Sequence, residues 1–191
     1  MNNINKQNGF TLVEIAIVLV IIGLLLGGVL KGQEMIKNAE IRGVITDIQG
    51  MSTAMYAYRD RYSAIPGDDS AAVTHLQAAT DVANGDGNGV IDYSGGSEVE
   101  DEQFFLQLRA ANLITGTGTA GPNHSLGGLV TVEDSVYGLS GTVFCAAAIE
   151  RADALILDVK EDDGVISTGT IQGATTGSYA TGTAVKLCFE S

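Results

Sequence analysis

An acidic loop near the middle of the chain holds the side chains best suited to binding chemistry. Oxygen-bearing side chains recur there at alternate positions and end on an aspartate: Asn84, Asp86, Asn88 and Asp92. Gly89 takes the sharp-turn position, and Val90 offers its backbone carbonyl. This spacing matches the first half of an EF-hand loop, in which alternate oxygens bind calcium. The sequence therefore predicts a calcium site formed by these four side chains and the Val90 carbonyl.

The loop departs from the EF-hand pattern at its end. The twelfth position, which usually supplies a bidentate glutamate, is Gly95. Glu98, Glu100 or Asp101 would have to fold back to replace that ligand. The alternative is a loop rich in Gly and Asn turns that binds no metal.

A second acidic segment, residues 158–164, ends in Asp163-Gly164, a pair typical of tight turns. Lys160 lies among its candidate ligands, which favours a turn over a second metal site. The two histidines, His75 and His124, are far apart; we expect His75 to be a partly buried structural residue and His124 to lie in a loop. The chain lacks a Gly-x-Ser-x-Gly element, a P-loop and a His-Glu-x-x-His pair, so no enzymatic activity is expected.

The charge distribution separates the two ends of the chain. The 191 residues contain 10 Lys and Arg against 23 Asp and Glu, a net charge of −13. Residues 62–191 hold 18 of those carboxylates and only four basic side chains. This balance argues against direct nucleic-acid binding through a basic face.

Residues 10–30 form an apolar run with a single charge, Glu14. As a helix, 21 residues span roughly 31 Å, about the thickness of a bilayer core. A simple membrane anchor would leave Glu14 unexplained, because an intramembrane carboxylate costs several kcal/mol unless it is paired. Snorkelling of Glu14 to the headgroups is the structural alternative.

The residues before and inside this run carry a resemblance: Lys6-Gln7-Asn8-Gly9-Phe10-Thr11-Leu12-Val13-Glu14. They resemble the class III leader of type IV pilins and pseudopilins. The resemblance implies that prepilin peptidase cuts between Gly9 and Phe10 and that the new Phe10 amine is N-methylated. It also implies that Glu14 pairs with the Phe10 amine of a neighbouring subunit, and that an inner-membrane assembly platform polymerises the chain with itself or with other pilins.

The pattern predicts that the helix continues to about Tyr62. Apolar residues recur at steps of three and four from Ile41 to Tyr62, and Pro66-Gly67 then breaks the helix. We expect four parts: a cleaved leader (1–9), a transmembrane or filament-core helix (10–30), an amphipathic helical half (31–62) and an acidic globular head (63–191). The resemblance implies an α+β fold of the pilin lollipop type, with the long helix packed on an antiparallel sheet.

Within the head, we expect short helices at about residues 101–112 and 146–159. Candidate strands are residues 128–132, 136–139, 164–171 and 184–189. Cys145 and Cys188 are the only cysteines, so a single intrachain disulfide is possible. Export to an oxidising compartment favours that disulfide, and two buried thiols are the alternative.

The function expected from the resemblance is a structural subunit of a type IV pilus-like filament. The precursor would cross the inner membrane once, with its N-terminus in the cytoplasm and its head in the periplasm. Two alternatives stay open: a pseudopilin of a type II secretion system, and a membrane-anchored calcium-binding or adhesive protein that never polymerises.

Overall fold

The computed structural model describes residues 11–77, 81–92, 100–173 and 184–190. It divides into two units, Met1–Ala39 and Glu40–Ser191. Gly9, Phe10, Gly95 and Glu98 lie outside the described residues, so the cleavage and methylation predictions concern positions that the structure does not describe.

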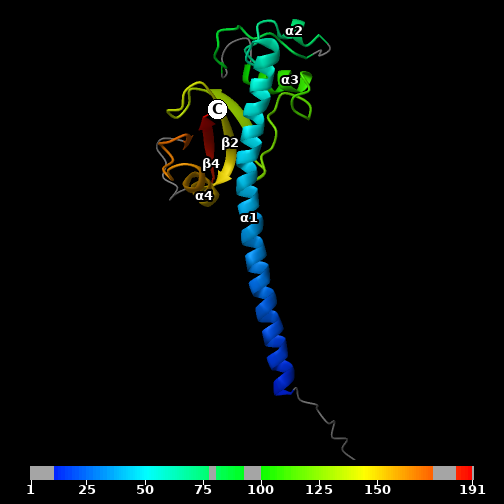
Figure 1. The fold of residues 1–191 in the computed structure, drawn as a ribbon, viewed down its shortest axis with the longest axis vertical. Coiled ribbons are helices and arrows are strands. Elements are labelled where there is room, and N and C mark those ends of the chain that lie inside the picture. The colour runs from blue at the N-terminus through cyan, green and yellow to red at the C-terminus, as the bar shows by residue number, and fades with distance from the viewer. Residues whose placement is uncertain (1–10, 78–80, 93–99, 174–183, 191) are drawn as a thin grey trace, which may run out of the picture. The chain divides into compact units, whose positions relative to one another are not determined.

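Helix α1 spans Leu12–Tyr62, close to the predicted bounds (Figure 1). Between Leu12 and Leu30 every side chain is exposed, large apolar ones included. Among the described residues, this is the one helix long and apolar enough to cross a membrane. Such a surface needs lipid or protein to cover it, because each exposed large apolar side chain loses about 1.5–3 kcal/mol relative to burial.

The second unit contains the C-terminal half of α1, and the predicted apolar stripe faces its core. Ile41, Val44, Ile48, Met55 and Tyr58 are buried. They share one apolar cluster with residues from the sheet and from α3 (Glu100–Ala110). The amphipathic half of the helix is therefore an integral part of the head.

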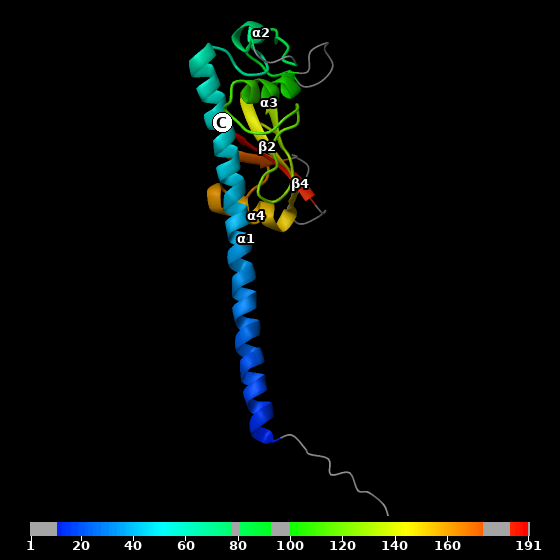
Figure 2. The same cartoon turned by 90° about the vertical axis from the view of Figure 1, so that its right-hand side faces the viewer.

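The sheet has four antiparallel strands in the order β1-β2-β4-β3. Figure 2 labels the two inner strands, β2 and β4, which pair with each other. Their bounds are β1 Val130–Asp134, β2 Thr142–Glu150, β3 Ile171–Gly173 and β4 Ala184–Glu190. Together with α1 they give the expected α+β architecture. Two further helices complete it, α2 (Ala72–His75) and α4 (Arg151–Glu161).

Several predicted element bounds in the head are wrong. The helix expected at 146–159 starts only at Arg151, because residues 142–150 form the central strand β2. Alanines at 146–148 suit a helix, yet pairing with β1 and β4 prevails over that local propensity. Residues 136–139 form only an isolated bridge, and the segment from 164 is a turn that precedes β3.

Candidate functional site

The start of α1 is closed by a reciprocal capping box between Thr11 and Glu14. Glu14 Oε2 accepts hydrogen bonds from Thr11 N and Thr11 Oγ1, both at 2.8 Å. Thr11 Oγ1 in turn accepts from Glu14 N at 3.3 Å. The arrangement satisfies backbone donors that a helix N-terminus leaves unpaired. It also directs the Glu14 carboxylate towards the residue that follows Phe10 in sequence.

Sequence reasoning assigned Glu14 a partner in another subunit and missed its partner within the chain. The signal was present, since Thr-x-x-Glu before an apolar run is the capping-box pattern.

Two of the five predicted calcium ligands, Asn84 and Asn88, use their side-chain oxygens to accept backbone hydrogen bonds. The Asn84 side-chain oxygen accepts from Val73 N at 2.9 Å, and that of Asn88 accepts from Val90 N at 2.7 Å. The Asn88 amide nitrogen donates to Asp86 and Asp92, at 2.9 and 3.3 Å. The two asparagines thus shape the loop through hydrogen bonds, as is usual for Asn in turns.

A different set of acids converges. Asp68, Asp86 and Glu100 place carboxylate oxygens within 4.8 Å of one another. Only Asp86 belongs to the predicted ligands, whereas Glu100 was one of the fold-back alternatives. Asp68 follows the Pro66-Gly67 turn. The spacing of residues within the loop gives no indication that Asp68 lies beside it.

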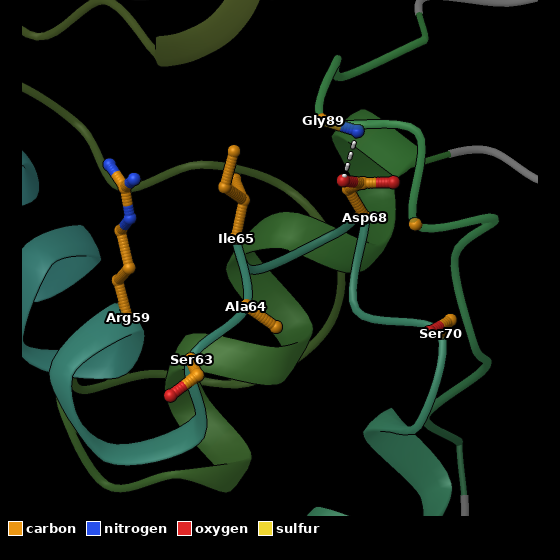
Figure 3. A pocket seen from close by; sticks show the side chains of 8 residues that line it. Arg59, Ser63, Ala64, Ile65, Asp68, Ser70 and Gly89 are labelled. Carbon is orange, nitrogen blue, oxygen red and sulfur yellow. Dashed lines mark hydrogen bonds between the residues drawn. The ribbon is translucent and has the colours of Figure 1, made fainter.

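Backbone donors hold the two buried acids in place. Asp68 accepts from Asn88 N at 2.9 Å and from Gly89 N at 2.8 Å, the latter bond drawn in Figure 3. Glu100 accepts from Asp86 N at 3.1 Å and from Asp92 N at 2.9 Å. The loop is therefore wrapped around two carboxylates that come from outside it.

Burial raises the pKa of both Asp68 and Glu100, although the backbone hydrogen bonds oppose this effect. The negative charges of Asp68 and Asp86 raise the pKa of Glu100 further. Three carboxylates this close repel one another when all are ionised. A hard divalent cation, which prefers carboxylate oxygens, would relieve that repulsion, so the donor chemistry of the cluster fits calcium.

The Pro66-Gly67 turn brings this cluster together. Gly67 has a φ of 89°, and a Cβ there would lie 2.5 Å from Glu100 O. Gln107 fixes the turn from α3, because its Oε1 accepts from Gly67 N at 2.7 Å and its Nε2 donates to Ala83 O at 3.0 Å. A side chain at residue 67 would therefore push Glu100 away from Asp68.

Asp69 ties the same turn to α1. Tyr58 Oη donates to Asp69 Oδ2 at 2.7 Å, and His75 Nδ1 contacts the same oxygen at 2.7 Å. Burial and the Asp69 carboxylate raise the pKa of Tyr58, so its phenol stays protonated and donates. The Tyr62 ring stacks on His75. His75 is thus structural, as predicted.

His124 is also structural. It is 3% exposed, and its Nε2 lies 2.8 Å from Ala147 O. Leu126 N donates to His124 Nδ1 at 3.2 Å. These contacts fix the loop before β1 onto the end of β2.

Cys145 and Cys188 form a disulfide between facing positions of β2 and β4. The pairing favoured from the sequence is present, and the described residues include no free cysteine.

The second acidic segment has the hydrogen bonds of a turn. Asp158, Asp162 and Asp163 also lie within 4.8 Å of one another. Each accepts from the turn: Asp158 from Gly164 N, Asp162 from Ile171 N, and Asp163 from Val165 N and Thr168 Oγ1. These bonds agree with the turn interpretation.

Comparison with known proteins supports the N-terminal assignment. Residues 4–30 match the family model described as the prokaryotic N-terminal methylation motif. This is the prepilin-type signal of type IV pilins and pseudopilins, a structural rather than an enzymatic class. The comparisons with curated proteins and with solved structures gave no match. The motif makes the N-terminus of this chain similar to that of type IV pilin-like proteins and pseudopilins, a class that in general is processed by prepilin peptidase and polymerises with pilins.

Proposed function

We propose that this chain is a non-enzymatic structural subunit of a type IV pilus-like extracellular filament. The observation that carries the proposal is the methylation motif at residues 4–30, whose apolar part forms the start of α1 and is exposed from Leu12 to Leu30 among the described residues. In a membrane, lipid covers that helix; in a filament, the helices of other subunits would cover it.

Glu14 would give the assembly its axial register. Its capping contacts with Thr11 use Oε2 and keep the carboxylate near the helix start. After cleavage between Gly9 and Phe10, a neighbour's Phe10 amine would be a suitable counter-ion. Removing one partner of such a pair inside an apolar bundle typically costs about 3–5 kcal/mol.

The precursor would sit in the inner membrane with residues 1–9 in the cytoplasm and the head in the periplasm, before extraction by the assembly platform. Electron microscopy of the fraction sheared from cells that express the chain tests the proposal. Wild-type cells should yield filaments, and cells with Glu14→Gln should not. Equal filament yield from both would contradict the proposed role of Glu14.

We further infer that the head binds calcium at Asp68, Asp86 and Glu100. Their proximity and the burial of two of them support this inference. Extracellular calcium modules have dissociation constants on the order of 10⁻⁴–10⁻³ M, which suits a site on an extracellular fibre. Isothermal titration of the head with calcium, with and without Asp86→Asn, tests it.

A further inference from the structure

A groove on the head lies between α1 and the strands β1 and β2. Its volume is about 350 Å³, which is at the lower end of the range for ligand pockets in proteins. Helix α1 contributes Met55, Tyr56 and Arg59 to its lining. The sheet contributes Asp134, the last residue of β1, and Thr142, the first residue of β2. We call this hollow the Arg59 groove.

Arg59 also connects the groove to a second hollow of about 300 Å³. Arg59, Ile65 and Gly89 line both hollows. Figure 3 shows the side chains of Arg59 and Ile65 extending in the same direction, from α1 and from the turn that follows it. Asp68 lines the second hollow as well, and it already belongs to the acid cluster. The Arg59 groove is therefore the part of this surface that has no assigned role.

Arg59 and Asp134 line the same groove without forming an ion pair. Among the described residues, Arg59 has no hydrogen-bond or ion-pair partner, and the Asp134 carboxylate accepts only from Ser135 Oγ, at 2.7 Å. A guanidinium only donates hydrogen bonds and a carboxylate only accepts them. The groove thus offers donors at one place and acceptors at another, with space between them for a ligand that uses both.

The remaining lining combines hydroxyl groups with an exposed aromatic side chain. Ser140 and Thr142 supply hydroxyls, and Ser140 is exposed. Tyr56 is 49% exposed, and its ring has an apolar face and a polar tip. Met55 and Ile65 add apolar side chains to the same lining. A ligand that fills the groove therefore needs an apolar face and several hydrogen-bonding groups at its edge.

Charge favours a neutral ligand. One cation, Arg59, and one anion, Asp134, line the groove, so their charges cancel. An acidic ligand would face a head in which carboxylates far outnumber basic side chains, and a simple cation would lie beside Arg59. Each hydroxyl of a sugar both donates and accepts hydrogen bonds, so a neutral saccharide satisfies Arg59 and Asp134 at once. The C–H face of its ring packs on an aromatic side chain.

We propose that the Arg59 groove binds a neutral saccharide unit. Sugar hydroxyls accept from the Arg59 guanidinium and donate to the Asp134 carboxylate, and one face of the sugar ring packs on Tyr56. The inference goes beyond filament assembly and does not depend on it, because the groove is formed within a single chain.

Binding of the full chain to immobilised sugars tests the proposal. The chain is solubilised in a detergent without a sugar headgroup, and a chelator is present so that calcium plays no part. The probes are lactose, maltose, cellobiose and N,N′-diacetylchitobiose, with a glucuronate-terminated disaccharide and the bare linker beside them. We expect binding to at least one neutral disaccharide. Binding to none of them, or to the glucuronate probe alone, would overturn the proposal.

Variants of the two charged residues locate the site. Arg59→Gln and Asp134→Asn should each weaken binding about tenfold or more, because each removes hydrogen bonds to a charged group. Arg42→Gln, at an exposed arginine of α1 outside the groove, is the matched control and should bind as the wild type does. The melting temperatures of all three should stay at the wild-type value. Unchanged binding by Arg59→Gln, or an equal loss from Arg42→Gln, would overturn the assignment to this groove.

Tyr56 supplies a readout that separates stacking from hydrogen bonding. Tyr56→Ala should weaken binding about as much as Arg59→Gln, whereas Tyr56→Phe keeps the ring and should retain it. Equal binding by Tyr56→Ala and the wild type would overturn the proposed pose. Sugar binding by a chain that forms no filaments would contradict the filament function alone, and filaments without sugar binding would contradict this inference alone.

Discussion

The carboxylate of Glu14 accepts two hydrogen bonds from Thr11, and Thr11 is the residue directly after Phe10. The charge at the helix start therefore has a partner before any subunit assembles. This contact orients the carboxylate at the end of α1, where the cleaved Phe10 amine would be presented. Under the proposed function, Glu14 would thus serve both helix capping and subunit pairing.

Variants of Thr11 and Glu14 should separate the effect of helix capping from the effect of the proposed pairing between subunits. Thr11→Val removes the hydroxyl and keeps the backbone donor, so we expect a cost of about 1 kcal/mol to the helix start and only a partial loss of filaments. Glu14→Gln removes the charge, so we expect almost complete loss. Quantification of sheared filaments by immunoblot shows which of the two variants loses more filaments. A greater loss from Thr11→Val than from Glu14→Gln would assign Glu14 a capping role only.

The disulfide between Cys145 and Cys188 should stabilise the head strongly. It closes a separation of 43 residues, and in the chain-entropy model a loop of that size is worth about 4 kcal/mol. When both cysteines are replaced by alanine, chemical denaturation of a fragment beginning at Glu40 should show a free energy of unfolding that is lower by this amount. Peptide mapping without reductant should recover the linked pair. Two free thiols in the exported protein would contradict this pairing.

Tyr58 should contribute through its hydroxyl as well as its ring. Tyr58→Phe leaves the buried Asp69 carboxylate without one donor, so we expect a cost of about 1–3 kcal/mol. Tyr56→Phe is the matched control, because Tyr56 is 49% exposed and should change stability little. Denaturation midpoints of the two variants measure the difference. Equal midpoints would mean that the Tyr58–Asp69 bond adds nothing to stability.

Calcium should raise the melting temperature of the head. At a tenfold excess over the dissociation constant, binding stabilises a fold by about 1.4 kcal/mol, which corresponds to roughly 3–6 °C for a domain of this size. Asp86→Asn should remove the rise, and Asp60→Asn, an exposed acid on α1, should retain it. Scanning fluorimetry in calcium and in chelator measures both. An identical wild-type melting temperature in the two buffers would mean that the loop is a turn that binds no calcium.

The sequence predicts those features that depend on neighbours along the chain. The stripe from Ile41 to Tyr58 has helical spacing, and its burial follows from that spacing. The Pro66-Gly67 break was likewise readable, because proline and glycine act locally.

Features set by contacts distant in sequence were missed. Asp68 lies outside the loop that it holds, and no local pattern places it beside Asp86, whereas Glu100 was one of the three residues named as able to fold back onto the loop. The alanines of β2 indicate a helix until pairing with β1 and β4 is known. The exposure of Leu155 and Ile156 on α4 could not be predicted either, since their residue types alone suit a buried stripe.

Mass spectrometry of the protein sheared from the cell surface tests the filament account most directly. The account predicts a chain that begins at N-methylated Phe10 in the sheared fraction. A surface chain that retains Lys6, or a mature chain confined to the membrane fraction, would contradict it.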